Sequence, residues 1–573
     1  MSTTSHTEGF FSDDPAGDRP VYRSDRRPDL LEIYPKSVPR YLEYPNTSAA
    51  GLLAQTCHTF PNRIATEFLG HTSTYGAIEH AVNSLASWLQ SREIHSGERV
   101  GILLPNCPEY LIALNAVWRA GGVAVSISPL SVASDVERLL SLTKCRTVIA
   151  LDMFSDLLST SEIDHHLLVS LFEYIPRWKQ AVYTGVRWKR TGNLHFPCQS
   201  NQTWMWDAVA TASGNLSPVE ILPDKDPAYI LSTGGTTGDP KAVTLSHKNI
   251  LANAWQQKHW VGSGSNDEQE TMLAVLPFFH SYGMSTMLAT GAALGAKLVM
   301  QPRFSPGRAL QAIERHKPTI FHAVPAMLAA MNQKLRRRRS DLSSLKWVIS
   351  GGASLPQETA SEFTNYSRAL VVEGYGLSEA SPVTHVGPLD GRNQTGTIGL
   401  PLPDTNCRVV DIEDPKKDLL PGEVGELLVK GPQVMLGYWN NAQATQQVLR
   451  EGWLHTGDLA RVNERGFYEI VDRKKDLIIT SGFNVYPADV EQVLRECPDI
   501  ADVAVVGVRD ASRGEIVKAC VVLNKGVRWN QARLDKFCQS RLAKHRRPLI
   551  WEHIADDLPR NFLGKVIRRE LRA

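Results

Sequence analysis

The sequence predicts an α/β protein with a large N-terminal domain and a smaller α+β domain at its C-terminal end. Three observations lead to this prediction. The chain of 573 residues is longer than one hydrophobic core supports, strand-like and helical segments alternate along most of it, and short strand-like pieces with Gly turns take over after residue 405. We expect a mobile lead-in over residues 1–40, a large domain over 41–473 and a small domain over 474–573.

The elements of the large domain begin with an amphipathic helix over Ile78–Leu89 and a strand over Val100–Leu104 that stops at a proline. A second helix over Glu109–Arg119 ends at two glycines, and a second strand follows over Val123–Ile127. Strand, helix and strand with Gly and Pro between them are typical of a parallel sheet. The same alternation predicts four later strands: Leu273–Leu276, Ala296–Met300, Ile320–Val324 and Trp347–Ser350.

Residues 150–222 differ, because aromatic and basic side chains mix there without a regular period. Two interpretations of residues 166–190 remain open. One is an interfacial patch that makes peripheral contact with the inner face of a membrane. The other is ordinary core with exposed charge around it.

Composition excludes several classes of protein. A net charge of +2 provides no overall field for nucleic acid, and the run Arg336–Arg339 favours a solvated helix end over a nucleic-acid site. The eight cysteines form no CxxC pair, which indicates free thiols in a reducing compartment and no structural zinc. With no apolar leader and no apolar run of about 18 residues, we expect a cytoplasmic protein.

The first chemical motif is the stretch Leu231–Lys241, which reads Leu-Ser-Thr-Gly-Gly-Thr-Thr-Gly-Asp-Pro-Lys and follows a strand-like run. Glycines let a backbone wrap closely around an anion, and hydroxyls and a lysine supply donors. The spacing is not that of a Walker A loop. The stretch is therefore either a phosphate-binding loop of another kind or a flexible Ser/Gly loop.

The second motif is Glu373–Glu379, which reads Glu-Gly-Tyr-Gly-Leu-Ser-Glu. It lacks the third glycine of a dinucleotide fingerprint, which disfavours an NAD site. Tyr375, Ser378 and Glu379 offer an aromatic face, a hydroxyl and a carboxylate, which suit a nucleobase, a phosphate and a hard cation. The alternative is a turn with an incidental acid.

Two further motifs lie near the expected domain boundary and the C-terminus. Trp453–Asp458 is followed by Asp472–Asp476, and a carboxylate with a nearby arginine can hold the hydroxyls of a ribose. Pro559–Lys565 ends in a lysine that can act as a mobile point charge. Taken singly, the first pair of stretches is more typical of solvated loop charges, and the last is more typical of a surface lysine.

Together and in this order, the four motifs resemble the adenylate-forming superfamily of acyl-CoA synthetases, luciferases and peptide-synthetase adenylation domains. The resemblance covers residues 50–573, and the branch to which the chain is most similar is that of the bacterial long-chain fatty acid CoA ligases. The doubled glycine at Gly234 and Gly235 and the extra segment before residue 223 are similar to that branch. Further signposts match: Leu276–His280, Gly351–Leu355, Gly396–Gly399 and Ser481–Pro487.

The resemblance implies a large multi-sheet N-terminal adenylate-forming domain with a small mobile C-terminal domain. It implies ATP, Mg²⁺ and coenzyme A as cofactors and a nucleotide site between the domains. The loop for the β- and γ-phosphates would comprise Thr233, Gly234, Gly235, Thr236, Thr237, Gly238 and Lys241. The nucleoside pocket would comprise Gly351, Gly352, Ala353, Glu373, Gly374, Tyr375, Gly376, Asp458 and Arg473, with Tyr375 on the base and Asp458 on the ribose.

The same resemblance implies the catalytic roles. Lys565 would bridge the acyl carboxylate and the α-phosphate, Ser378 would contact that phosphate, and Glu379 would hold Mg²⁺. The remaining assignments are a pocket-mouth residue, a hinge residue and a glycine of the coenzyme A tunnel: His280, Lys475 and Gly482.

The implied reaction converts a fatty acid, ATP and coenzyme A into acyl-CoA, AMP and pyrophosphate. Three alternatives stay open: a ligase that loads a carrier protein from acyl-AMP, a ligase for aryl or other acids, and a non-catalytic nucleotide-binding relative. The sequence departs from the family pattern at Gly234, Ala242 and Ser378, where Ser, Gly and Thr are more usual. None of these departures removes a charge or a donor that the chemistry needs.

Overall fold

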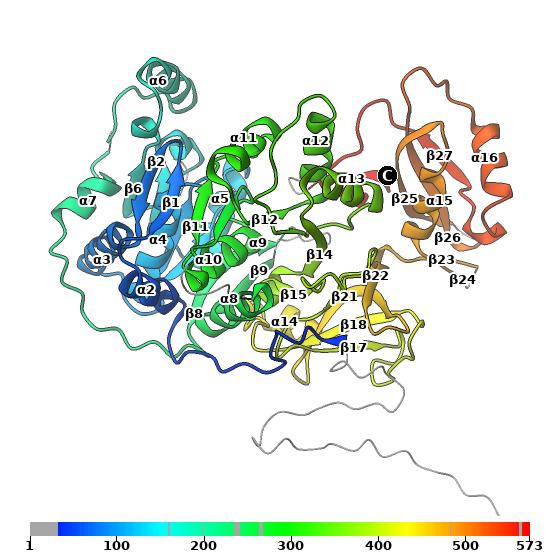
Figure 1. Cartoon of the computed structure of the whole chain (residues 1–573), viewed down its shortest axis with the longest axis horizontal. Coiled ribbons are helices and arrows are strands. Elements are labelled where there is room, and N and C mark those ends of the chain that lie inside the picture. The colour runs from blue at the N-terminus through cyan, green and yellow to red at the C-terminus, as the bar shows by residue number, and fades with distance from the viewer. Residues whose placement is uncertain are drawn as a thin grey trace, which may run out of the picture.

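The structure is a computed structural model that describes residues 33–158, 161–197, 199–233, 241–262, 268–481, 483–510, 512–560 and 564–572. Four sheets carry the fold, three of them in the large domain and one in the small domain. Figure 1 shows the small domain beside the large one, with the C-terminus at the boundary between them. The α/β fold class predicted from the sequence is confirmed.

The first sheet has eight strands in the order β19-β9-β8-β4-β3-β5-β6-β7, and its central strands are parallel. Alternation of strand and helix produces this arrangement, because a helix carries the chain back over the sheet before each new strand. The strands are β3 (Arg99–Leu103), β4 (Val123–Ser126), β5 (Thr147–Leu151), β6 (His165–Val169), β7 (Gln202–Trp204), β8 (Pro227–Thr233), β9 (Lys241–Ser246) and β19 (Gly437–Tyr438).

The second sheet has nine strands in the order β16-β15-β14-β13-β12-β10-β11-β1-β2. Its six middle strands run parallel and its outer strands pair antiparallel. The strands are β1 (Ile64–Phe68), β2 (His71–Thr74), β10 (Thr271–Ala274), β11 (Lys297–Met300), β12 (Ile320–Ala323), β13 (Trp347–Ser350), β14 (Leu370–Gly376), β15 (Val383–Val386) and β16 (Leu400–Pro401).

Helices cover both sheets, and one large core joins them. Helix α4 is almost wholly buried, which places it between layers and not at the surface. The helices are α2 (Ala49–Thr59), α3 (Tyr75–Ser91), α4 (Pro108–Arg119), α5 (Ala133–Thr143), α6 (Arg177–Thr191), α7 (Met205–Thr211), α8 (His247–Val261), α9 (Ser281–Gly283), a π-helical turn η3 (Met284–Ala289), α10 (Thr290–Leu294), α11 (Pro306–His316), α12 (Pro325–Leu335), α13 (Gln357–Ser367) and α14 (Ala442–Val448).

The third sheet closes the large domain next to the small one. It consists of β17 (Asn406–Val410), β18 (Gly425–Lys430), β20 (Leu449–Arg450), β21 (Trp453–Val462) and β22 (Tyr468–Arg473). The chain leaves β22 through a 3₁₀ turn, Lys474–Asp476, and not through an extended linker.

The small domain has its own hydrophobic core between one sheet and two helices. Its elements are β23 (Ile478–Thr480), β24 (Phe483–Val485), α15 (Pro487–Arg495), β25 (Ile500–Asp510), β26 (Gly514–Leu523), α16 (Gln531–Gln539) and β27 (Ile550–His553). A separate core allows this unit to move as one body.

Two sequence-based expectations need correction. The predicted lead-in extends to residue 40, but residues 33–40 pack against the large domain. Tyr34 is buried and its hydroxyl donates to the Pro401 carbonyl over 3.1 Å, and Arg40 donates to the Leu402 carbonyl over 2.9 Å. Residues 1–32 lie outside the described part of the chain.

The second correction concerns residues 150–222, where the sequence suggested little regular structure. They contain α6, which spans 15 residues. Only Tyr183 of this helix is buried, so no apolar stripe repeats toward a core and the usual helical signal is missing.

Candidate active site

The candidate site lies at the carboxyl ends of the parallel strands β12, β13 and β14. Ligands of open α/β sheets bind at this edge because the loops that leave the strands converge there. The loop after β13 carries Gly351, Gly352 and Ala353, and the end of β14 carries Tyr375 and Gly376.

Two positions here require glycine, because neighbouring atoms leave no room for a side chain. A Cβ atom on Gly376 would lie 1.9 Å from the carbonyl oxygen of Pro382, and one on Gly351 would lie 2.9 Å from the Tyr282 hydroxyl. Real Cβ atoms do not approach so closely, so a side chain at either position would displace the strand end or close the pocket beside it.

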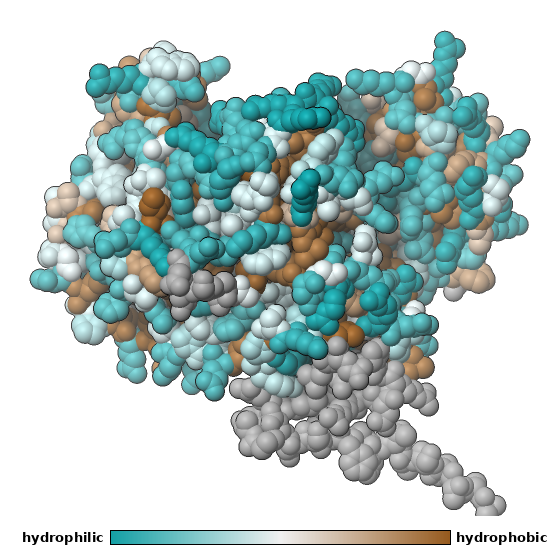
Figure 2. Space-filling view, viewed as in Figure 1, coloured by the Kyte–Doolittle hydropathy of each residue, from teal (hydrophilic) through white to brown (hydrophobic). Residues whose placement is uncertain are grey.

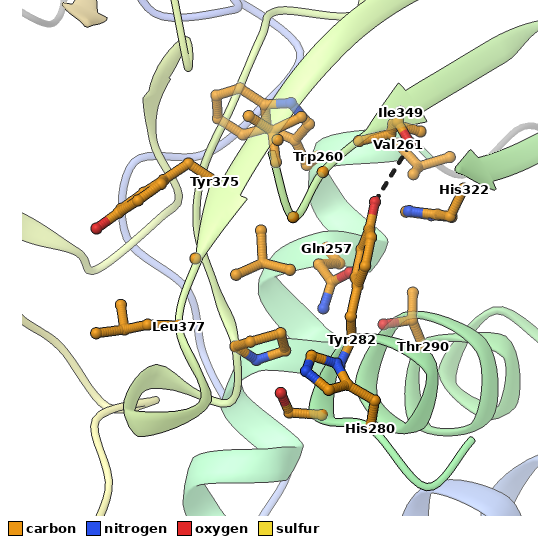
Figure 3. Close-up of a pocket in the computed structure, with 18 of the residues that line it drawn as sticks. Gln257, Trp260, Val261, His280, Tyr282, Thr290, His322, Ile349, Tyr375 and Leu377 are labelled. Atoms are coloured by element: carbon orange, nitrogen blue, oxygen red, sulfur yellow. Dashed lines mark hydrogen bonds between the residues drawn. The ribbon is translucent and has the colours of Figure 1, made fainter. Parts of the chain in front are cut away.

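A mostly apolar pocket opens below these loops (Figure 3). It encloses about 760 Å³ of empty space, its open mouth included. Its apolar lining comes from α8, β10, α10 and the strands around β14: Trp260, Val261, Met272, Leu294, Ile349, Leu377, Val383, Val386 and Leu389. A pocket of this chemistry accommodates hydrocarbon.

His280 also lines the pocket, as the sequence resemblance implies. Its Nδ1 accepts a hydrogen bond from the Tyr282 amide over 3.2 Å, which caps the short helix α9. Burial lowers the pKa of His280 to about 4, so the imidazole is neutral near pH 7.

Part of the pocket wall is polar. Thr290 and Gln257 precede the apolar Leu294 and Val261 by one helical turn, and His322 lies on β12. The Oγ1 atom of Thr290 and the Nδ1 atom of His322 are buried with no hydrogen-bond partner. Buried polar atoms without partners are uncommon, so these two indicate a place where a ligand or water is bound.

Asp458 is the centre of a second cluster, at the end of the third sheet. Its Oδ2 accepts a hydrogen bond from the Tyr375 hydroxyl over 2.5 Å, and its Oδ1 lies 2.5 Å from Nε of Arg473. Burial and the Asp458 charge raise the pKa of Tyr375 well above its usual value, so the phenol stays a donor. A carboxylate has further lone pairs, which leaves Asp458 able to accept from the hydroxyls of a bound sugar.

Lys565 of the small domain faces this cluster. Burial and the positive charge of Arg473 together lower its pKa to about 8, and the negative charge of Asp458 opposes the shift. A Cβ atom on the adjacent Gly564 would lie 3.3 Å from Cβ of Ala326, so this loop touches helix α12 of the large domain. The structure therefore brings the C-terminal lysine to the edge of the candidate site.

Lys475 lies in the 3₁₀ turn between the domains. Burial and the neighbouring Arg473 lower its pKa. Its carbonyl oxygen accepts from Arg572 over 3.4 Å, and Arg572 also pairs with Asp476 over 2.7 Å. The last residues of the chain thus brace the turn that joins the domains.

A third cluster surrounds Glu379, whose Oε1 accepts a hydrogen bond from the Tyr438 hydroxyl over 2.9 Å. Nζ of Lys241 lies 5.0 Å from the centre of the Tyr438 ring, which is a cation–π distance. The Ser378 hydroxyl is 2.9 Å from that of Ser281. The second carboxylate oxygen of Glu379 can serve a cation.

Glu373 accepts a hydrogen bond from the Leu355 amide over 2.9 Å, and burial raises its pKa to about 7. This contact ties the end of β14 to the loop after β13. Glu373 therefore helps to position the pocket wall, and the next residue, Gly374, lines the pocket directly.

Sequence reasoning missed Tyr438, Ser281 and His322. Tyr438 reaches Glu379 only because the two-residue strand β19 pairs with β9, nearly two hundred residues earlier in the chain. No local pattern encodes that pairing. His322 could have been noticed as a lone histidine in an apolar strand.

Several expected residues lie outside the described part of the structure. They are Gly234, Gly235, Thr236, Thr237, Gly238 and Gly482, together with the side chain of Thr233. Lys241, which ends the phosphate-loop motif, is described and begins β9.

The family follows from a comparison with known families. A model of the AMP-binding enzyme matches residues 53–439, and a model of the AMP-binding enzyme C-terminal domain matches residues 489–565. The chain belongs to the AMP-binding enzyme family. The resemblance to adenylate-forming enzymes drawn from the motifs is therefore confirmed.

Individual relatives of this AMP-binding enzyme are similar over nearly their whole length. A long-chain-fatty-acid–CoA ligase of Bacillus subtilis is 38% identical over 551 residues, which are 95% of this chain and 98% of that protein. A feruloyl-CoA synthase of an Amycolatopsis species is 32% identical over 513 residues, which are 89% and 96% of the two chains. The crystal structure of ATP-bound MatB from Rhodopseudomonas palustris superposes with a TM-score of 0.80 at 27% identity, over 92% and 98% of the chains.

Two negative findings apply to the described residues of this AMP-binding enzyme. No described helix combines the length and the apolar character that crossing a bilayer requires. Within the same residues, no group of three or more His, Cys, Asp or Glu side chains converges as a metal site.

Proposed function

We propose that this AMP-binding enzyme is a fatty acid CoA ligase, which converts a medium- to long-chain acid, ATP and coenzyme A into acyl-CoA, AMP and pyrophosphate through an acyl-adenylate. The observation that carries the proposal is the position of the apolar pocket. Ser378, His280 and Tyr375 line it, Tyr375 connects it to Asp458, and the charge of Asp458 acts on Lys565 of the small domain. The names of the curated relatives support the same reaction.

The first half-reaction joins two anions, so its main requirement is neutralisation of charge. Lys565 supplies a cation between the acyl carboxylate and the α-phosphate, and Ser378 donates to that phosphate. Asp458 accepts from the ribose hydroxyls, and Tyr375 and Arg473 hold its carboxylate in place. Positioning and electrostatics then account for the rate, because little proton transfer is needed.

Mg²⁺ fits Glu379. One carboxylate oxygen is oriented by Tyr438 and the other is available, which suits an ion that takes one or two carboxylates together with substrate phosphates and water. When bound, Mg²⁺ would neutralise phosphate charge and polarise the bond to the leaving pyrophosphate. The Lys241 ammonium lies beside Tyr438 and would add positive charge on the same side of the phosphates as Mg²⁺.

The second half-reaction is attack of the coenzyme A thiol on the acyl-adenylate. We propose that residues 474–573 rotate about Lys475 for this step, which removes Lys565 and brings the hairpin β23–β24 with Gly482 toward the site. Ile479 and Phe483 of this hairpin are 51% and 55% exposed in the present arrangement. Exposed apolar side chains on a moving hairpin support a second docked position for it.

Separate assays of the two half-reactions test these roles. Lys565→Ala should abolish acyl-adenylate formation and leave thioester formation from added acyl-adenylate. Gly482→Leu should do the reverse. The matched control is Lys536→Ala, which removes an exposed lysine from α16 of the same domain. Equal loss of both half-reactions in Lys565→Ala would refute the role of that lysine.

A second candidate substrate is an acid with a polar group on its chain or ring. The unpartnered buried atoms of Thr290 and His322 favour it, and a feruloyl-CoA synthase is among the relatives. Pyrophosphate release with acids from acetate to oleate, benzoate and their hydroxylated counterparts separates the candidates. Turnover that peaks with plain long chains supports the fatty acid, and a peak with hydroxylated acids supports the second candidate. Adenylate without thioester would instead indicate a carrier-loading ligase.

A further inference from the structure

Helix α6 stands out from the body of the large domain at the upper left of Figure 1. Its sequence, Arg-Trp-Lys-Gln-Ala-Val-Tyr-Thr-Gly-Val-Arg-Trp-Lys-Arg-Thr, contains five cations and no acid. It takes no part in the active site described above.

One face of α6 is fixed to the protein. The Tyr183 hydroxyl donates to Oδ1 of Asp152 over 2.5 Å, and Arg187 donates to Oδ2 of the same residue over 2.9 Å. The Asp152 side chain is fully buried, so both contacts are shielded from solvent. Tyr183 and Arg187 are one turn apart, which fixes the helix in one rotational setting.

A second face of α6, about a third of a turn around the helix from the first, is apolar and exposed. Trp178, Val182 and Val186 follow each other at intervals of four residues and are 72%, 61% and 45% exposed. Trp188 adds an indole ring that is 55% exposed. Spacing of four places the first three on one stripe of the helix, so the protein presents a continuous apolar edge outward.

Cations border this stripe. Lys179 and Lys189 are exposed beside it, and Arg177 and Arg190 lie at the two ends of the helix. Figure 2 shows hydrophilic and hydrophobic surface side by side on this projection. Tryptophan, valine and cations on one convex face are the composition of helices that lie in the headgroup region of an anionic bilayer.

We propose that α6 docks this enzyme on an anionic lipid surface, with Trp178, Val182 and Val186 inserted among the acyl chains and Lys179 and Lys189 on the lipid phosphates. A protein groove could take the apolar stripe, but the absence of any acid on α6 and its convex position favour a surface of uniform negative charge. The inference goes beyond the proposed function, because it concerns where the enzyme works and not what it converts.

Flotation of the full chain with lipid vesicles tests the proposal. We expect binding to phosphatidylcholine vesicles that contain phosphatidylglycerol, much weaker binding to pure phosphatidylcholine, and release at high salt. Lys179→Glu with Lys189→Glu should lower the partition coefficient on anionic vesicles at least about tenfold. Trp178→Ser with Val182→Ser and Val186→Ser should lower it by a similar factor.

The matched control reverses two exposed arginines elsewhere, Arg337→Glu with Arg339→Glu, and should leave vesicle binding unchanged. Thermal unfolding and turnover of a water-soluble acid should be unchanged in all three variants, because the substituted side chains are exposed and remote from the site. Failure of the wild type to bind anionic vesicles would overturn the proposal. Undiminished binding by either α6 variant, or equal loss in the arginine control, would overturn it as well.

Discussion

The pKa of Lys565 makes the first half-reaction sensitive to pH in a range where few side chains titrate. The lysine is crowded at the domain boundary beside Arg473, and its pKa falls from 10.5 to about 8. Only the protonated form can neutralise the two anions that react. Because raising the pH removes that proton, adenylate formation should decline with a midpoint near pH 8.

The size of the effect follows from the titration. With a pKa of about 8, roughly nine-tenths of Lys565 is protonated near pH 7 and roughly one-tenth near pH 9. The kcat/KM for adenylate formation should therefore fall about tenfold between pH 7 and pH 9. Bound ATP adds negative charge beside the lysine and raises its pKa, so the midpoint of kcat should lie higher than that of kcat/KM.

The assay is pyrophosphate release without coenzyme A, measured from pH 6.5 to 10 at constant ionic strength. Lys565→Arg is the informative variant, because a guanidinium stays charged throughout this range and should flatten the profile. Thioester formation from added acyl-adenylate should not decline, since a thiol becomes more reactive as pH rises. A flat wild-type profile, or the same midpoint in Lys565→Arg, would refute the reasoning.

Three further predictions concern the pocket wall and the cation site. Native Glu373 keeps its proton up to about pH 7 whereas the unfolded chain loses it near pH 4.5, so the free energy of unfolding should fall by up to about 3 kcal/mol as pH rises through this window. Glu373→Gln should lack that decline in urea denaturation at pH 5 and pH 8. Tyr438→Phe loses the 2.9 Å hydrogen bond to Glu379 and should raise the Mg²⁺ concentration for half-maximal adenylation about tenfold, for a loss of about 1.4 kcal/mol; an unchanged Mg²⁺ dependence would contradict the orienting role. Gly376→Ala would place a methyl group 1.9 Å from the Pro382 carbonyl and should cost about 1–3 kcal/mol of stability, which a lowered Tm would report.

The sequence predicted those parts of the fold in which pattern and packing agree. The strand expected over Val100–Leu104 is β3, at Arg99–Leu103, and the helix expected over Glu109–Arg119 is α4. Both are buried, so they appear in the sequence as apolar runs, and a proline and two glycines mark where these runs end. Helix α6 was not predicted from the sequence, because its outer face is exposed and its inner face is held by polar contacts to Asp152.

The candidate site was predicted by type of residue more than by geometry. The motifs pointed to Tyr375, Asp458 and Lys565, but not to the hydrogen bond between the first two or to the lowered pKa of the third. Those properties depend on segments far apart in the chain, and a single sequence does not encode such distances locally. The partnership of Tyr438 with Glu379 is of the same kind.

The ion pair between Asp458 and Arg473 connects nucleotide binding to the rotation of the small domain. Asp458 is the carboxylate proposed for the ribose, and Arg473 is the last residue before the turn that carries the small domain. If a bound nucleotide alters this ion pair, it also alters the preferred orientation of the small domain. Thermodynamic linkage makes the influence mutual: if the nucleotide favours the present orientation by some factor, a rotation out of it weakens nucleotide affinity by the same factor. The enzyme would thus loosen its hold on AMP in the same movement that admits the thiol, and product release would be timed by the domain itself.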